Sequence, residues 1–322
     1  MLRKCVGIIG LGIMGSAMSA NLLRAGYRVV GYDVLASRRR SHRQSGGEVA
    51  PNCREVGRQA AIVICSLPSS EALRQTAMEL AEAPTGPPRP QHGRPQRGAR
   101  AGMAPIVIET STLPLVVKQE ARRILGARGT ILLDCPLSGT GAQARAKDLI
   151  VYGSGDRSAY RRAVPVMEGF ARAHYYVGAF GAGSKTKFVA NLLVAIHNVA
   201  AAEALVLAMK AGLDPAMVLK VVADGAGSSR MLQMRGPMMV KGDYSDATMK
   251  LEIWQKDMTI IADFAREVGC PTPLFAASAS FYTAALAMGR HGEDTAAVCA
   301  VLEKMAGTKR ASTKKVKVQR SK

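Results

Sequence analysis

Six residues near the N-terminus have the types and the spacing to bind a dinucleotide. Residues 10–15 read GLGIMG and follow an apolar run at 6–9, and a second apolar run at 28–32 ends in Asp33. Glycines at these places permit a tight turn, close approach of the backbone to a pyrophosphate, and close packing of the next helix on the strand. N–H groups at the start of that helix favour phosphate. The predicted coenzyme-binding residues here are Gly10, Leu11, Gly12, Ile13, Met14, Gly15 and Asp33.

Asp33 also indicates which coenzyme is preferred. It would accept hydrogen bonds from the adenosine ribose hydroxyls, and its carboxylate would repel the 2′-phosphate of NADP, so NAD is the preferred coenzyme and NADP the alternative. The arginines at 38–40 lie close enough in sequence to weaken that preference. Taken singly, the glycines could form a plain turn and Asp33 a strand-end cap. Their occurrence together, in a strand–turn–helix–strand context, favours the dinucleotide site.

Lys187 and Asn191 form a second pair that could do chemistry. They lie in an Ala- and Leu-rich run at 181–212 that no proline interrupts, which predicts a long helix. Residues four apart share a helix face. Gly181 and Gly183, just before them, would let the backbone approach a ligand. The alternative is an ordinary helix with a solvated lysine. Because the helix follows a dinucleotide pattern, we expect it to carry the other half of a site.

Two further predicted strands end in residues that could line such a site. The apolar run 61–65 is followed, after Ser66, by Leu67 and Pro68, which are predicted to face the coenzyme because ligands bind where parallel strands end. The run 130–134 leads into the small-residue loop 136–142. Such a loop offers N–H groups and a serine hydroxyl to an anion, or it forms a plain turn.

The order of the elements predicts an α/β fold. Strands and helices alternate up to residue 180, which is typical of a Rossmann doubly wound sheet, and the pattern is helical only from residue 183. We therefore predict a Rossmann domain at 1–180 and an all-α domain at 181–307, joined by a long interdomain helix. A Pro-, Gly- and Arg-rich insertion at 84–104 and a basic tail at 308–322 lack any apolar period, and the tail is predicted to be disordered.

The net charge of +20 is concentrated in 38–43, 89–100 and 309–322, which contain no acidic residue. These stretches are either basic decoration of an ordinary enzyme or a means of attracting nucleic acid. The six cysteines show no metal-binding spacing, so no metal site is expected and the thiols are expected to be free in the cytoplasm. No secretory signal is recognisable at the N-terminus. Polar residues within the apolar helix, such as Asn198 and Glu203, argue against a membrane span.

Four motifs together resemble the β-hydroxyacid dehydrogenase family. They are GLGIMG at 10–15, DCPLSGTGA at 134–142, GAGSKTKFVAN at 181–191 and KD at 256–257. The resemblance covers about residues 4 to 306 except the insertion. It implies hydride transfer between NAD(P) and a small β-hydroxy acid, such as 3-hydroxyisobutyrate, 2-hydroxy-3-oxopropionate or a threonate-like acid. A homodimer or homotetramer is also expected.

The same resemblance implies a role for each matching residue. Lys187 matches the catalytic lysine, which acts as general acid and base, and Asn191 matches the residue that orients the reacting hydroxyl. The residues implied to bind ligands are Ser138, Gly139 and Thr140 for the substrate carboxylate, and Thr112 and Lys256 for the nicotinamide end of the coenzyme. Many members have two consecutive glycines after the serine. Thr140 replaces the second one here, and its side chain would narrow the pocket.

Two other functions stay open at the level of the sequence. An imine reductase could use the same fold, although such enzymes usually lack a lysine at the position of Lys187. A binding protein could instead use the basic segments on nucleic acid. The presence of both Lys187 and Asn191 favours the dehydrogenase over either alternative.

Overall fold

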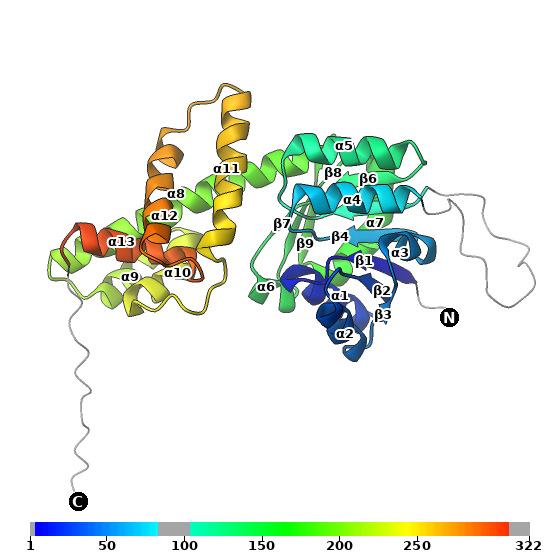
Figure 1. Ribbon diagram of the computed structural model, residues 1–322. Coiled ribbons are helices and arrows are strands. Elements are labelled where there is room, and N and C mark those ends of the chain that lie inside the picture. The colour runs from blue at the N-terminus through cyan, green and yellow to red at the C-terminus, as the bar shows by residue number, and fades with distance from the viewer. Residues whose placement is uncertain (1–3, 83–103, 309–322) are drawn as a thin grey trace, which may run out of the picture. The chain divides into compact units, whose positions relative to one another are not determined.

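The computed structural model describes residues 4–82 and 104–308 of the chain (Figure 1). The chain divides into two compact units, residues 1–191 and 192–322. The division therefore falls inside a helix, later than the boundary predicted at 180, because the first turns of that helix pack on the sheet of the first unit. The predicted insertion, apart from Ala104, and the predicted tail after Thr308 lie outside the described residues.

A nine-stranded sheet forms the centre of the first unit within its described residues. The strands lie in the order β3-β2-β1-β4-β5-β6-β8-β7, and β9 pairs with β8. The first six are parallel, whereas β8 runs antiparallel to β6 and β7. Their bounds are β1 Cys5–Ile9, β2 Arg28–Tyr32, β3 Glu48–Val49, β4 Ile62–Cys65, β5 Ile106–Glu109, β6 Ile131–Asp134, β7 Leu137–Ser138, β8 Ile150–Ser154 and β9 Ala173–Gly178. The strand order reverses between β1 and β4, which is where doubly wound sheets bind their ligands.

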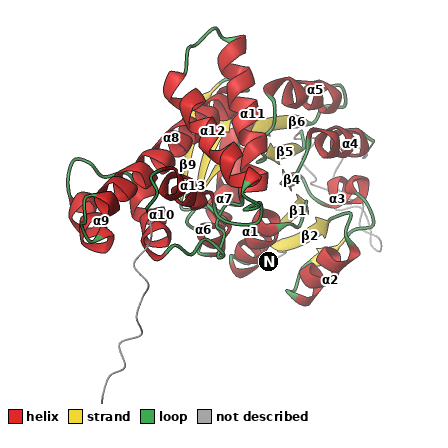
Figure 2. Cartoon of the chain, turned by 60° about the vertical axis from the view of Figure 1, so that its left-hand side comes forward, coloured by secondary structure: helices red, strands yellow, loops and turns green. Residues whose placement is uncertain are grey.

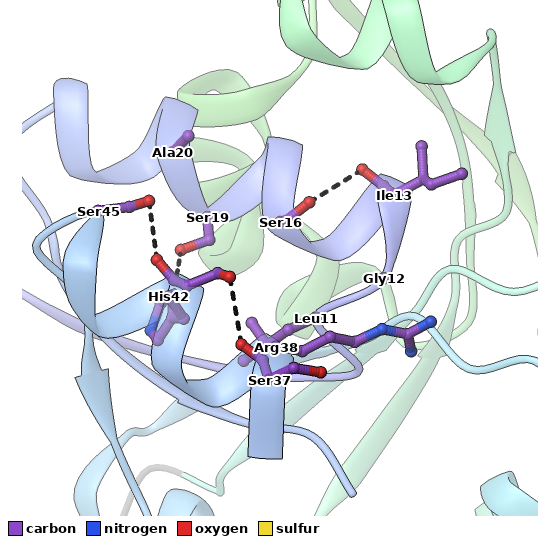
Figure 3. A pocket seen from close by; sticks show the side chains of 11 residues that line it. Leu11, Gly12, Ile13, Ser16, Ser19, Ala20, Ser37, Arg38, His42 and Ser45 are labelled. Atoms are coloured by element: carbon purple, nitrogen blue, oxygen red, sulfur yellow. Dashed lines mark hydrogen bonds between the residues drawn. The ribbon is translucent and has the colours of Figure 1, made fainter. Parts of the chain in front are cut away.

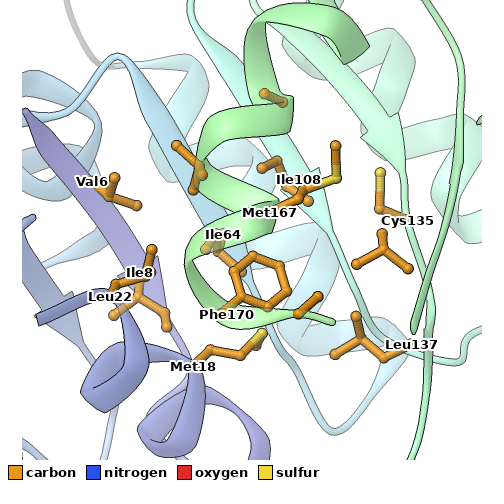
Figure 4. Close-up of a cluster of buried hydrophobic side chains, with 14 of the residues drawn as sticks. Val6, Ile8, Met18, Leu22, Ile64, Ile108, Cys135, Leu137, Met167 and Phe170 are labelled. Carbon is orange, nitrogen blue, oxygen red and sulfur yellow. The ribbon is translucent and has the colours of Figure 1, made fainter. Parts of the chain in front are cut away.

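Helices cover both faces of this sheet (Figure 2). They are α1 Ile13–Arg24, α2 Ala36–Gln44, α3 Cys53–Gln59, α4 Ser70–Ala81, α5 Leu115–Gly126, α6 Gly141–Arg145 and α7 Arg157–Phe170. Alternate residues of the strands enter two different cores: Ile8 packs with α1 and α7, as Figure 4 shows, whereas Ile9 packs with α3, α4 and α5. Both faces are apolar because both are covered, as expected for a largely parallel sheet.

Apart from one isolated β-bridge, all regular secondary structure in the described residues of the second unit is helical, as predicted. It contains the later part of α8 Ala182–Lys210, followed by α9 Pro215–Asp224, α10 Arg230–Lys241, α11 Leu251–Glu267, α12 Pro273–Ala287, the 3₁₀ turn Thr295–Ala297 and α13 Val298–Met305. The observed fold class is therefore the predicted one, a Rossmann-type sheet followed by an all-α unit.

Helix α8 is long and apolar enough to cross a membrane, judged by length and composition alone. A packed core helix passes the same test. Asn198 of α8 behaves as a residue of a core helix: it is fully buried, and its Nδ2 donates to the hydroxyl of Tyr282 at 3.2 Å and to the carbonyl of Thr295 at 2.8 Å.

Several elements were not predicted, each for a reason that its own residues show. Helix α2 buries only His42 and is otherwise composed of Arg, Ser and other exposed residues, so no apolar stripe marks it. Helix α10 contains Pro237, which normally argues for a break. Strand β7 and helix α6 are too short to show a period, and the loop predicted at 136–142 is divided between them. Helix α1 begins at Ile13, inside the glycine motif.

Asp294 joins three segments of the second unit. Its Oδ1 accepts from Arg235 Nε at 3.0 Å and from the backbone N–H of Ala296 at 2.9 Å. Its Oδ2 accepts from the backbone and the hydroxyl of Thr248, at 2.8 and 2.7 Å. Burial by itself would raise the pKa of Asp294, but Arg235 and the N–H donors hold it below its ordinary value.

Replacing Asp294 with asparagine should therefore destabilise the second unit strongly. Breaking a buried ion pair by removing one partner costs about 3–5 kcal/mol. Because the folded-state pKa is lowered, the contribution of Asp294 is present at neutral pH and is lost as the pH falls through that pKa, below about 4. Denaturant unfolding followed by Trp254 fluorescence measures both effects. The control is Asp263→Asn, which breaks the exposed ion pair with Arg266. If Asp263→Asn lowered the free energy of unfolding as much as Asp294→Asn does, the stabilising role of the buried Asp294 contacts would be contradicted.

Candidate functional site

The glycine turn after β1 leaves open space at one glycine and not at the other two. A Cβ atom on Gly10, where φ is +88°, would lie 2.1 Å from the Ser66 carbonyl oxygen. A Cβ on Gly15 would lie 1.8 Å from the carbonyl oxygen of Gly10. Gly12 differs, because the nearest protein atom would be Arg38 Nη1 at 3.7 Å. Gly10 and Gly15 are therefore required by the protein itself, whereas the bare backbone of Gly12 fits close approach of a pyrophosphate.

Asp33 holds this turn in place. Its buried Oδ2 accepts from the backbone N–H of Leu11 at 2.8 Å, and its Oδ1 accepts from that of Leu35 at 2.9 Å. Arg38 Nη1 also lies 3.2 Å from Oδ2. A carboxylate has acceptor capacity beyond these three bonds. Asp33 thus holds the glycine turn in place and keeps acceptor capacity for a ribose. The sequence alone did not distinguish this structural role from the predicted binding of the ribose.

A groove of about 360 Å³ opens beside the glycine turn, between α1 and α2 (Figure 3). Arg38 and Gly12 are among its lining residues. At its other end Ser19 Oγ lies 3.1 Å from His42 Nδ1, and burial lowers the pKa of His42, so this histidine is neutral at pH 7. Arg38 is consequently the charged side chain among those lining the groove, and it lies where it could reach a coenzyme phosphate.

The loops after β4 and β5 are bound to one another. Leu67 contacts the turn, since its Cδ2 would lie 3.4 Å from a Cβ on Gly10. The backbone N–H of Leu67 donates to Ser111 Oγ at 2.8 Å, and Pro68 is exposed next to it. Thr112, predicted to contact the nicotinamide, follows Ser111 on the same loop and is partly buried. The two loops begin where β4 and β5 end, and the predicted contacts of Leu67, Pro68 and Thr112 with the coenzyme stay predictions.

The loop that carries Ser138 and Gly139 packs against the glycine turn. Gly139 has a φ of +133°, a conformation that favours glycine. A Cβ on Gly141 would lie 2.5 Å from Ile13 Cγ2, so Ile13 and Gly141 are in direct contact. Thr140 caps helix α6: its Oγ1 accepts from the N–H of Gln143, whose side chain accepts from the N–H of Thr140. The added hydroxyl of Thr140 thus bonds within the protein.

The start of α8 packs on the strand end that leads into this loop. A Cβ on Gly183 would lie 2.6 Å from the Asp134 carbonyl oxygen and 3.1 Å from Pro136 Cδ, and a Cβ on Gly181 would lie 2.9 Å from Leu115. The two glycines therefore allow close packing of the helix on the sheet. The prediction that they let the backbone approach a ligand is wrong, because protein atoms already fill that space.

Lys187 and Asn191 follow on the same helix, inside the first unit. Lys187 is partly exposed, and Asn191 is buried at 4% exposure. Both belong to the face that also carries Ser184, which is bonded to Asp134. Lys256 lies on α11 of the second unit, where its Nζ is 3.3 Å from Asp257 Oδ1. Its predicted contact with the nicotinamide stays a prediction.

A buried charge cluster beside these residues was not predicted. Lys118, Glu109 and Asp134 are all fully buried. The available signal was Lys118 directly after the apolar run 115–117, together with the acidic residues Glu109 and Asp134 at the ends of two apolar runs. Among the described residues, no group of three His, Cys, Asp or Glu side chains could hold a metal ion.

Comparison with known proteins covers both units. Residues 5–178 match the NAD binding domain of 6-phosphogluconate dehydrogenase, and residues 181–302 match the domain described as NAD-binding of NADP-dependent 3-hydroxyisobutyrate dehydrogenase. The L-threonate dehydrogenase of Cupriavidus necator is 33% identical over 92% of this chain and 95% of its own length. These matches span the parts of the chain that carry all four motifs.

Solved structures agree with these sequence matches. The Mycobacterium tuberculosis 3-hydroxyisobutyrate dehydrogenase, solved with L-serine, has a TM-score of 0.81 and 28% identity, covering 94% of this chain and 99% of its own. An imine reductase of Streptomyces aurantiacus is more distant, with a TM-score of 0.58 and 19% identity over 93% of this chain and 99% of its own, and shares the fold alone. The chain belongs to the β-hydroxyacid dehydrogenase family and is an NAD(P)-dependent dehydrogenase of hydroxy acids.

Proposed function

We propose that the protein catalyses the reversible oxidation of a small β-hydroxy acid with NAD as the preferred coenzyme. Lys187 accepts the hydroxyl proton during oxidation and returns it during reduction, and Asn191 orients that hydroxyl. Ser138, Gly139 and Thr140 bind the substrate carboxylate. The coenzyme, when bound, supplies the hydride chemistry. The residues of the chain bind the reactants, orient them and move the proton.

One observation carries this proposal: contacts within the first unit bring three separate motifs together. Ile13 of the glycine turn contacts Gly141 of the loop after Ser138. The helix that carries Lys187 packs through Gly183 on Asp134, the strand end leading into the same loop. The predicted phosphate-binding turn thus contacts the predicted anion-binding loop, and the helix that carries the proposed proton carrier packs on the strand end before that loop. Hydride transfer to or from a hydroxy acid requires such groups close together.

For the substrate we propose a threonate-like β-hydroxy acid. The support is the C. necator relative, whose name is L-threonate dehydrogenase. Within its capping box the Thr140 hydroxyl only accepts, so the side chain adds bulk to the loop and keeps its O–H as a donor for the substrate. The test is to screen L-threonate, 3-hydroxyisobutyrate and 2-hydroxy-3-oxopropionate with both coenzymes by nicotinamide absorbance. A kcat/KM for 3-hydroxyisobutyrate tenfold above that for L-threonate would overturn this choice of substrate.

Coenzyme preference should depend on Asp33 and Arg38 in opposite ways. Asp33→Asn removes the charge that repels a 2′-phosphate and frees Arg38 from its 3.2 Å pairing. We expect the ratio of kcat/KM for NADP to that for NAD to rise by about tenfold, equivalent to about 1.4 kcal/mol. Arg38→Met should lower the same ratio, because it removes the cation that lies next to Gly12 and lines the groove. An unchanged ratio in both variants would contradict the assignment; asparagine is chosen over alanine because it can still accept the Leu11 N–H.

We further propose a homodimer or homotetramer in the cytoplasm. Large apolar side chains of the second unit are exposed, including Leu207 at 70%, Leu274 at 68% and Val221 at 63%. Exposed apolar surface of this kind often marks an interface. All six cysteines are free thiols, as expected in a reducing compartment. Light scattering after gel filtration and imaging of a fluorescent fusion would test the two statements; a monomeric mass would refute the first, and secretion the second.

A further inference from the structure

Three charged side chains lie fully buried at the ends of neighbouring strands. Lys118 Nζ, from α5, is 2.7 Å from Glu109 Oε2 at the end of β5 and 2.8 Å from Asp134 Oδ1 at the end of β6. Burial by itself would lower the pKa of Lys118, but the two carboxylates raise it above its usual range, so the ammonium stays charged. With their usual charges, the three groups carry one excess negative charge inside the protein.

This excess charge faces the first turn of α8. Asp134 Oδ2 accepts from the backbone N–H of Ser184 at 2.7 Å, and Oδ1 accepts from the Ser184 hydroxyl at 2.8 Å. Ser154 Oγ accepts from the N–H of Gly183 at 3.0 Å and donates to the Asp134 carbonyl at 3.0 Å. A carboxylate is favoured at a helix N-terminus by the unpaired N–H groups and the helix dipole. The cluster therefore fastens α8 to the sheet.

The cluster also reaches the loops at the carboxyl ends of β4 and β5. Glu109 Oε1 accepts from the backbone N–H of Ser111 at 2.9 Å, and Ser111 Oγ accepts from that of Leu67 at 2.8 Å. One unbroken series of hydrogen bonds and ion pairs thus runs from Leu67, beside the glycine turn, to Ser184. It lies entirely within the first unit, and every member is a described residue.

The turn that this series holds is the one that places Lys187. Ser184 and Lys187 are three residues apart, and Asn191 is one further turn along, so all three share a face of α8. A helix is stiff over two turns. The bonds to the Ser184 amide and hydroxyl and to the Gly183 amide therefore fix this segment of α8 against rotation about the helix axis and against sliding along it. Lys187 lies on that segment.

We propose that Lys118 is a positioning residue, which holds Asp134 against the first turn of α8 through its ion pairs and so sets the place of Lys187. Stability alone is a poor reason for such a cluster, since buried ion pairs can often be replaced by apolar groups without loss. Without Lys118, Asp134 loses the 2.8 Å ion pair that fixes its Oδ1, whether or not Glu109 keeps its charge. Asp134 would then move away from Ser184. The proposal rests on the proposed role of Lys187.

The test is the double variant Lys118→Met/Glu109→Gln, which removes the cation together with one carboxylate. A displacement on the order of 1 Å can cost about 10²-fold in rate. We expect kcat to fall by roughly 10- to 100-fold, with the Kd for NAD and the KM for the hydroxy acid nearly unchanged. Circular dichroism and the thermal midpoint verify folding. The matched control is Arg74→Met, which breaks the half-buried ion pair with Glu120 in the same unit and should leave kcat unaltered.

A second background separates positioning from general damage. In Lys187→Ala, the same double variant should cause no further loss of kcat, because the residue being positioned is already absent. An equal loss in both backgrounds, or normal kcat in the folded double variant, would overturn the positioning role. If Lys187→Ala itself kept normal kcat, the proposed function would fail instead. Should the double variant not fold, Ser184→Ala, which removes one bond and no charge, must show a smaller fall in kcat that also vanishes in Lys187→Ala.

Discussion

Replacing Lys187 with alanine is expected to lower kcat by about 10²- to 10⁴-fold, the usual contribution of general acid–base catalysis. Affinity for NAD should stay nearly normal, because Gly10, Gly12 and Gly15 are untouched. Lys187→Arg should not restore the rate, since a guanidinium does not release its proton at usable pH. A small primary amine added to Lys187→Ala should restore part of it. Steady-state kinetics, with NAD affinity measured separately by titration, provide the readout.

Two further variants on α8 make this test specific. Lys185 is exposed on the same helix, two residues away, and Lys185→Ala should change kcat little. Asn191→Ala should lower kcat/KM less than Lys187→Ala does, because it removes an orienting group and leaves the proton carrier. If Lys187→Ala retained near-normal kcat, or if Lys185→Ala were the inactive variant, the catalytic lysine would be wrongly assigned.

Gly12→Ala should fold normally and bind coenzyme poorly. The protein leaves room for a Cβ at Gly12, where Arg38 Nη1 would be nearest at 3.7 Å, so the thermal midpoint should barely change. A methyl group there would stand where the backbone must approach the pyrophosphate. We expect the Kd for NAD to rise by at least about tenfold, which is about 1.4 kcal/mol. Isothermal titration together with thermal unfolding measures both quantities.

Gly15→Ala should give a different result. Its Cβ would lie 1.8 Å from a backbone oxygen, so the turn and helix α1 must shift and the protein should be destabilised as well as weakened in binding. Gly126→Ala is the matched control, because no atom lies within 4 Å of the added Cβ. Equal loss of NAD affinity without loss of stability in Gly12→Ala and Gly15→Ala would contradict the division of roles between these glycines.

Local patterns in the sequence were sufficient to predict most of the first unit. The strands β1, β2 and β4 and the helix α8 have apolar runs of the right period, and their observed bounds differ from the predicted ones by few residues. The region of α2, β3 and α3 was missed, because α2 buries only His42, β3 has two residues and α3 has seven. In physical terms, an element that buries few side chains leaves little periodic signal.

The sequence by itself determined the family, the α/β fold, the glycine turn and the pairing of Lys187 with Asn191 on one face, because each depends on residues close together in the chain. Only the tertiary structure decided what those residues contact. It showed that Gly183 allows helix packing, that Asp33 accepts from the N–H of Leu11, and that Lys118 joins two strand ends, one of which is bonded to α8. Such contacts join segments far apart in sequence and depend on how the whole unit packs. They therefore cannot be predicted from the local periodicity of apolar residues.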